Sequence, residues 1–220
     1  MPMKKTDVPA PHPGEPAAAP APARALRAVV FTALFAALFA VLSSIAIPVG
    51  PVPVTLQTFG AMIAGGLLGA RYGFASVLLA VGLAAAGLPI FHGKGGLAYV
   101  LGPTGGYIFS FPLAALLVGW ASDRLFPGRV RPARLTPSRL LLLFAAMIAF
   151  GVAVPYLFGV PWLAFRADMG LAEAVAAGLV PFLPGDAAKA AAAALVVAAL
   201  RPYMPKLGNL NLRAADRGQT

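Results

Sequence analysis

The chain has 220 residues, of which 60% are hydrophobic and 11% charged, and its formal net charge is +10. Soluble domains average about 45–50% apolar and about 25% charged residues, so this composition excludes an ordinary soluble domain and predicts an integral membrane protein. Because the chain has no Cys and only two His, it also excludes disulfides, a Cys nucleophile, and thiolate or His-rich metal sites.

Residues 1–24 are rich in Pro and Ala and contain almost no large apolar side chain. Such a segment has little to bury, so we expect a disordered tail rather than a signal peptide, whose apolar core would follow the start closely. The first apolar run begins near Leu26 and indicates a retained membrane helix. We therefore expect three parts: the tail, a membrane domain over 25–205, and a basic cytoplasmic tail over 206–220.

The apolar runs predict an all-α membrane protein with six spanning helices. These helices are expected over 26–47, 56–70, 72–90, 104–122, 139–160 and 185–201. The second and the sixth are short and bounded by Gly or Pro, so their limits are the least defined. Residues 171–183 are too few to span the bilayer and end in prolines, so we expect them to form a helix or lid at the membrane interface.

Basic residues lie mainly on one side of this topology. With the N-terminus in the cytoplasm, 14 of the 17 Lys and Arg fall in inner segments, whereas Lys94 and Arg166 fall outside and Lys189 lies inside a helix. This positive-inside pattern predicts a multi-pass protein of the cytoplasmic membrane with both termini in the cytoplasm. It also explains the net charge without a nucleic-acid partner. The linker 123–139 is read as a topology determinant, with contact to anionic lipid or a cytoplasmic partner as the alternative.

The last predicted helix carries two opposite charges in its first turns. Asp186 and Lys189 interrupt a run of Ala, Leu and Val, and at three residues apart they lie about 60° apart on one helix face. On insertion scales each would cost roughly 2.5–3.5 kcal/mol at the bilayer centre, so both should face protein or a water-filled cavity. A ligand site is the favoured interpretation, and an ion pair that only holds the bundle together is the alternative.

Three outer segments carry most of the remaining polar and small residues. They are 48–60, with Thr55, Gln57 and Thr58, then 92–111, and 161–170. Glycines allow the backbone to approach another surface and prolines fix the shape of a loop, so these segments resemble the roof of a pocket. Their position above an intramembrane Asp and Lys favours a ligand site over ordinary tight connections.

Enzyme chemistry has no support in the sequence. The glycines around Lys94 and over 102–106 do not have the spacing of a phosphate loop, and they face away from the side that holds ATP. The chain also has no Ser-His-Asp set, no paired intramembrane Asp residues and no H-E-x-x-H motif.

Small residues spaced four apart recur on the predicted helices. They are Ala33/Ala37, Ala36/Ala40 and Gly65/Gly69. Each pair allows another helix to approach closely, so the first helix offers a stripe that could dock a second protein. In a chain so rich in Ala, spacing alone favours packing within the bundle over such docking.

With these residues in view, the chain resembles the BioY family, the biotin-binding S components of energy-coupling factor (ECF) transporters, over about residues 26–205. The resemblance is carried by PVPVTLQTFGAMIAGGLLG (51–69), by GLPIF and GKGGLAYVLGPTGGYIFSF within 87–111, and by FLPGDAAK (182–189). GPTGGY and G-D-x-x-K are specific in combination. The resemblance implies a six-helix S-component bundle that captures biotin from outside with high affinity and has no catalytic chemistry of its own.

The resemblance also implies which residues contact the ligand. The candidates are Asp186, Lys189, Tyr107, Gly105, Thr104, Gln57, Thr55 and Lys94, the last at a position where family members often carry Arg. A carboxylate such as Asp186 can accept the ureido N–H bonds of biotin, and an ammonium such as Lys189 can donate to the ureido carbonyl or to the carboxylate tail. The expected apolar walls are Tyr107, Phe109, Trp162 and Phe91.

Partners follow from the same resemblance: a transmembrane coupling protein and two ABC-type ATPases, with no cofactor beyond biotin as the transported substrate. In such families an A-x-x-x-A stripe on the first helix meets the coupling protein. Here that stripe falls on Ala33/Ala37 or on Ala36/Ala40.

Three rival functions stay open on the sequence alone. An S component for another vitamin would use the same bundle. An autonomous channel or small permease would need a polar line to the inner face, yet the last helix has no charged residue between Lys189 and Arg201. A structural membrane assembly protein would suit the Ala stripes and the basic linker.

Overall fold

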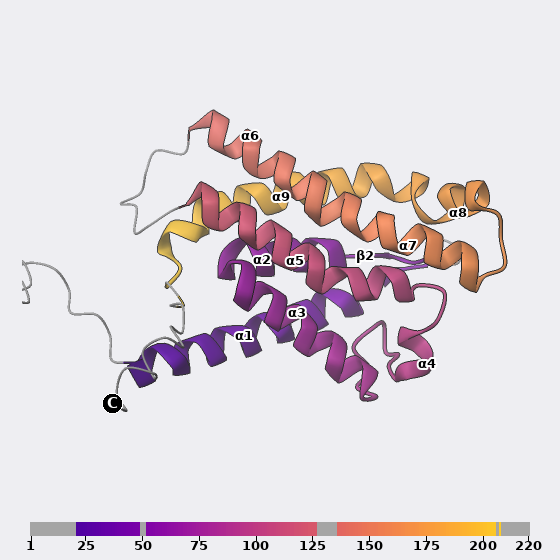
Figure 1. Ribbon diagram of the computed structural model, residues 1–220, viewed down its shortest axis with the longest axis horizontal. Coiled ribbons are helices and arrows are strands. Elements are labelled where there is room, and N and C mark those ends of the chain that lie inside the picture. The colour runs from indigo at the N-terminus through magenta and orange to yellow at the C-terminus, as the bar shows by residue number, and fades with distance from the viewer. Residues whose placement is uncertain (1–20, 49–51, 127–135, 206, 208–220) are drawn as a thin grey trace, which may run out of the picture.

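Helices that match the apolar runs make up the bundle. The computed structural model describes residues 21–48, 52–126, 136–205 and 207. Within them lie α1 (Ala21–Ser44), α2 (Gln57–Leu68), α3 (Ala70–Ala85), α5 (Gly105–Leu125), α6 (Pro137–Ala146), α7 (Ala153–Arg166) and α9 (Leu183–Leu200). A π-helical segment, η1 (Met147–Val152), joins α6 to α7 in one continuous path (Figure 1). The expected all-helical membrane fold is confirmed.

Four stretches of the described chain are long and apolar enough to cross a membrane. They are Pro22–Ser44, Gly105–Leu125, Pro137–Arg166 and Leu171–Tyr203. Helices α2 and α3 have 12 and 16 residues, fewer than the roughly 20 residues of a straight span. Two of the six expected spans are therefore short helices, which meet at Gly69 and pack against α5.

Helix boundaries differ from the expected ones at several points. Helix α1 already begins at Ala21, so the end of the segment expected as a tail is helical, while the rest of that segment lies outside the described residues. Helix α7 extends to Arg166 through Pro161, so six of the ten residues of the expected outer loop 161–170 are helical. In place of the interfacial segment 171–183 lie α8 (Leu171–Gly178) and η2 (Val180–Phe182), which confirm a helix there and lead into α9.

The α2–α3 hairpin packs closely on itself and on α5 because the contacting residues are glycines. A methyl group at Gly65 would collide with the carbonyl oxygen of Ala115, and one at Gly73 would lie 2.6 Å from the Gly65 Cα. Gly69 has a φ of +84°, which favours glycine, and it forms the turn between the two helices. The predicted small-residue pair thus serves two purposes, close approach at Gly65 and chain reversal at Gly69.

A polar cluster joins four helices beside this turn. Asp123 of α5 accepts a hydrogen bond of 3.0 Å from the backbone N–H of Ala70. Arg201, directly after α9, forms an ion pair with Asp123 and donates to the carbonyl oxygen of Leu67. The ends of α2, α3, α5 and α9 are therefore fixed to one another.

Charge separates between the two ends of the bundle. One end holds the starts of α1 and α6, the ends of α5 and α9, and the α2–α3 turn (Figure 1). These segments carry Arg24, Arg27, Arg71, Arg124, Arg139 and Arg201. The other end holds α4 (Leu97–Val100), α8 and a short strand pair, and its basic residues are the exposed Lys94 and Arg166 and Lys189, which reaches the strand pair. Most of the described basic residues therefore lie at one end of the bundle.

The strand pair was not expected from the sequence. Strands β1 (Ala46–Ile47) and β2 (Val54–Thr55) are antiparallel, with Ala46 opposite Thr55 and Ile47 opposite Val54. They connect the end of α1 to the start of α2. Because β2 is followed directly by α2, the pair fixes where Thr55 lies relative to the bundle.

The packing of α1 against the bundle determines which of its alanines are accessible. Ala36 is 5% exposed and belongs to the hydrophobic core with Phe35 and Phe39. Ala33 and Ala37 are exposed, and Ala40 is half-buried against the core. The methyl group of Ala36 is therefore covered by the bundle, which leaves Ala33 and Ala37 as the accessible pair on α1.

Candidate functional site

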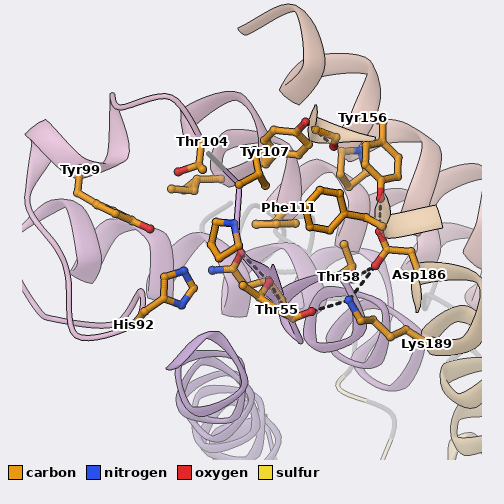
Figure 2. Close-up of a pocket in the computed structure, with 17 residues that line it drawn as sticks. Thr55, Thr58, His92, Tyr99, Thr104, Tyr107, Phe111, Tyr156, Asp186 and Lys189 are labelled. Atoms are coloured by element: carbon orange, nitrogen blue, oxygen red, sulfur yellow. Dashed lines mark hydrogen bonds and ion pairs between the residues drawn. The ribbon is translucent and has the colours of Figure 1, made fainter. Parts of the chain in front are cut away.

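A cavity opens at the end of the bundle that holds the strand pair, α4 and α8. Its volume is about 550 Å³ with the open mouth included, and side chains from β2, α2, α5, α7 and α9 converge on it (Figure 2). Its apolar and aromatic lining consists of Val52, Pro53, Tyr99, Tyr107, Ile108, Phe111, Pro155, Tyr156 and Phe182. Apolar walls with a few convergent polar groups are typical of small-molecule sites.

Asp186 and Lys189 lie together at one side of this cavity. The Lys189 Nζ is 2.9 Å from the Asp186 Oδ1, and the two side chains are 14% and 5% exposed. The Lys189 Nζ also donates a hydrogen bond of 2.5 Å to the carbonyl oxygen of Thr55. The predicted shared helix face is confirmed, and the two charges do pair with each other.

Two hydroxyl groups complete the surroundings of the carboxylate. Thr58 donates a hydrogen bond of 3.0 Å to the Asp186 Oδ1, and the Tyr156 hydroxyl donates to the Asp186 Oδ2 (Figure 2). A carboxylate offers about four acceptor positions and an ammonium three donors. The described contacts use three acceptor positions of Asp186 and two N–H donors of Lys189. Each group thus keeps capacity for one further hydrogen bond.

Two tyrosines form an aromatic wall beside the carboxylate. The rings of Tyr107 and Tyr156 meet edge to face, with centroids 6.2 Å apart. The Tyr107 hydroxyl donates a hydrogen bond of 2.9 Å to the carbonyl oxygen of Gly178. Any side chain at Gly159 or Gly178 would collide with Tyr107, so these glycines make the space that the ring occupies. Tyr107 therefore presents its ring to the cavity and commits its hydroxyl to the protein.

The glycines of the GPTGGY segment serve packing. A methyl group at Gly105 would lie 2.8 Å from the Trp162 Nε1, and one at Gly106 would collide with the backbone and Trp162 of α7. The Trp162 Nε1 donates a hydrogen bond of 2.8 Å to the carbonyl oxygen of Gly102. The segment thus seats the start of α5 flush against α7, which places Thr104 and Tyr107 at the cavity.

A second polar group of side chains lines the cavity away from Asp186. It consists of His92, Tyr99 and Thr104, and Figure 2 shows His92 well separated from the Asp186–Lys189 pair. Burial lowers the pKa of His92 below the ordinary value of 6.5, so the imidazole is neutral at pH 7. Burial also raises the pKa of Tyr99. The cavity therefore has an ionic end and a neutral polar end.

Most of the sequence-predicted contacts line the cavity. Thr55, Gln57, Thr104, Tyr107, Asp186 and Lys189 do so, whereas Gly105 and Lys94 are not among the described lining residues. Lys94 is exposed, and its backbone pairs with Phe91. Of the expected walls, Tyr107 is the one among the described lining residues. Phe91 is buried and stacks on Tyr99. Trp162 packs on the start of α5, and Phe109 is 47% exposed.

Sequence reasoning missed Tyr156, His92, Tyr99 and Phe111 as lining residues. Tyr156 follows Pro155 in an apolar run, where an aromatic residue is read as part of the core. His92 and Tyr99 belong to an expected outer segment, but nothing in their spacing marked them as facing inward. The available signal was the residue type, since a Tyr or His in an apolar helix or loop needs a polar partner.

Comparisons with known proteins agree with this geometry. The BioY family matches residues 14–206 of the chain. A probable biotin transporter BioY of Pyrococcus horikoshii is 40% identical over 160 residues, 72% of this chain and 86% of that protein. A biotin transporter BioY of Rhizobium etli is 40% identical over 158 residues, 71% of this chain and 82% of that protein.

A solved structure is similar as well. The crystal structure of the S-component for biotin from an ECF-type ABC transporter superposes with a TM-score of 0.71 at 33% identity, covering 80% of this chain and 91% of that one.

Proposed function

The chain belongs to the BioY family, and on that premise we propose that it captures biotin at the outer face of the cytoplasmic membrane as the S component of an ECF-type ABC transporter. It is a multi-pass membrane protein and a transport subunit rather than an enzyme. One observation supports the ligand above all: a buried Asp186–Lys189 pair, with one acceptor position and one donor unused, faces a largely apolar cavity.

The chemistry of biotin suits these groups. Its ureido ring carries N–H donors and a carbonyl acceptor on a compact apolar bicycle. Asp186 accepts one ureido N–H at its free position, and the third N–H of Lys189 donates to the ureido oxygen. The Tyr107–Tyr156 wall and Phe111 pack on the apolar part of the ring system. Thr55, Gln57 and Thr104 supply further hydrogen bonds around it.

A titration of the purified protein with biotin tests the function. The chain has two Trp, and Trp162 packs on the segment that seats Tyr107 at the cavity, whereas Trp120 lies beside Arg124. We expect biotin to change the tryptophan fluorescence saturably, with a dissociation constant below about 1 µM. The change should persist in Trp120→Phe, which leaves Trp162 as the reporter. An equal response to thiamine, or none to biotin, would contradict the assignment.

Energy for transport comes in this proposal from a transmembrane coupling protein and two ABC-type ATPases. The exposed Ala33/Ala37 stripe on α1 is the surface proposed for the coupling protein, because two small side chains one turn apart permit close helix approach. The same helix exposes Val29, Val30, Leu34 and Leu38, which face lipid or the partner.

The proposed orientation places the basic end of the bundle and both termini in the cytoplasm. Single cysteines at Ala10 and Asn211, which lie outside the described residues, test it in a chain that has no native Cys. We expect both to stay unlabelled by a membrane-impermeant maleimide in intact cells and to react after permeabilisation. A cysteine at Arg166, at the opposite end, should label in intact cells and serves as the positive control. Labelling of either terminus from outside would reverse the topology.

A further inference from the structure

His92 sits in a tight turn at the edge of the cavity. The backbones of Phe91 and Lys94 exchange two hydrogen bonds of 2.9 and 2.8 Å, so His92 and Gly93 are the two central residues of the turn. Their φ values are +50° and +75°. Turns with both central residues at positive φ most often use Asn, Asp or Gly. His also tolerates positive φ, so the turn permits an imidazole at this position without requiring one.

The His92 ring is held at the cavity and carries an unused nitrogen. It lines the cavity and meets the Tyr99 ring edge to face, with the ring centroids 6.5 Å apart. The backbone of Ser43 at the end of α1 acts to raise its pKa, against the larger lowering by burial. Its Nδ1 is buried and has no hydrogen-bond partner among the described residues. Buried polar atoms are nearly always hydrogen-bonded, so this ring at the cavity wall has capacity for one further partner.

The charges around the cavity show what kind of partner is missing. Asp186 and Lys189 face it from α9 and neutralise each other. Tyr99 on α4, Tyr107 on α5 and Tyr156 on α7 are the other titratable groups in the described lining, and all three are neutral near pH 7. A ligand that carries a carboxylate therefore adds a net negative charge to a partly buried site, which is unfavourable unless a cation forms beside it.

His92 is the lining side chain that can become a cation near neutral pH. Lys94 is charged and lies in the same turn, but it is exposed and is not among the described lining residues. Figure 2 places His92 away from the ionic pair, so a ligand whose ring lies at Asp186 and Lys189 would extend its tail towards His92.

We propose that His92 takes up a proton from solvent when the ligand carboxylate enters this end of the cavity, and that the resulting imidazolium pairs with the carboxylate. The inference rests on the proposed function, because it assumes biotin, whose tail ends in a carboxylate. It assigns the two ends of the ligand: the ureido ring at Asp186 and Lys189, and the carboxylate at His92.

The sign of the pH dependence follows from linkage. Burial lowers the pKa of His92 below 6.5, and a carboxylate beside the ring raises that pKa in the complex. Affinity for biotin is therefore greatest at low pH and falls as pH rises between the two pKa values, by at most tenfold per pH unit. Tyr99 does not titrate in this interval because its pKa is raised from 10.0.

The decisive measurement compares biotin with its uncharged primary amide on the full chain in lipid nanodiscs between pH 6 and pH 9. We expect the dissociation constant of biotin to rise about tenfold or more across this range and that of the amide to change less than about twofold. Calorimetry in two buffers of different ionisation enthalpy should detect proton uptake with biotin and not with the amide. This comparison needs no variant, so folding defects do not affect it.

Two variants identify the residue. His92→Asn keeps a side chain suited to positive φ and should abolish the pH dependence for biotin, whereas Lys94→Gln should retain it. Parallel pH curves for biotin and the amide, or an unchanged slope in His92→Asn, would overturn the inference while leaving biotin capture intact. A slope lost in Lys94→Gln but kept in His92→Asn would overturn it too. If biotin fails to bind at every pH, the proposed function fails and this inference with it.

Discussion

Asp186→Asn and Lys189→Met should each raise the dissociation constant for biotin about 10- to 150-fold, because a hydrogen bond to a charged group is worth about 1.5–3 kcal/mol. In Asp186→Asn the amide keeps one acceptor oxygen, but it turns an NH₂ group towards hydroxyls that now donate to the carboxylate. In Lys189→Met the donor to Thr55 and to the ligand is lost together.

The same variants should also lower stability. Each leaves its former partner as an unpaired charge, and the two side chains are only 5% and 14% exposed. The structure thus gives weight to the alternative that the pair only holds the bundle together, since the two charges lie within salt-bridge distance of each other. Binding and stability must therefore be measured on the same proteins.

The double variant Asp186→Asn/Lys189→Met separates the two roles. If the pair is purely structural, removing both charges restores the melting temperature and the affinity together. If both groups contact biotin, the double variant regains stability and still binds poorly. Thr58→Val is the matched control, because it removes one neutral donor to Asp186 and leaves both charges; its effect on affinity should be smaller. Native affinity in a well-folded double variant would refute the pocket assignment.

The ionic end of the site could be predicted from the sequence because it depends on helix geometry alone. Three residues of separation place Asp186 and Lys189 on one face whatever the rest of the fold does. The partners that complete this end could not be predicted in the same way. Tyr156 comes from α7, thirty positions earlier in the chain, and its hydroxyl reaches Asp186 only because of how the two helices pack.

For the neutral polar end of the cavity, the sequence indicated which residue types are present but not which of them face the cavity. The glycines of 92–111 indicated close backbone approach, and the structure shows Gly105 against Trp162 and outside the described cavity lining. Lys94 has the charge expected of a contact but is exposed, whereas His92 of the same turn lines the cavity. A reversal of chain direction over two residues exchanges which side chain faces inward, and residue type alone does not reveal it.

Short helices were the weak point of the fold prediction. Counting apolar residues treats every helix as a straight span, whereas α2 and α3 are joined by Gly69 and covered by their neighbours. The faces of α1 posed a similar problem, because a helix rich in Ala has two small-residue stripes of equal spacing. Only the packing of Phe35 and Phe39 into the core decides between them.

The two stripes of α1 predict opposite defects for the same substitution. Ala33→Trp or Ala37→Trp adds a bulky group to an exposed position, so we expect an unchanged melting temperature, unchanged biotin affinity and loss of most of the coupling protein on co-purification, because close helix approach requires small side chains. Ala36→Trp places the same group in the core, where Ala36 is 5% exposed. Overpacking there should cost about 1–3 kcal/mol of stability.

Melting temperature, biotin affinity and recovery of the partner, measured on all three variants in parallel, test this division. Ala36→Trp is the control for general disruption, because it should lower the melting temperature. A variant at Ala33 or Ala37 that loses the partner but keeps its melting temperature therefore identifies the docking surface. If both exposed variants co-purify with the coupling protein as well as the native chain does, the partner docks elsewhere. The half-buried Ala40, one turn further along, then has no claim either, since only the exposed stripe leaves room for a second helix against α1.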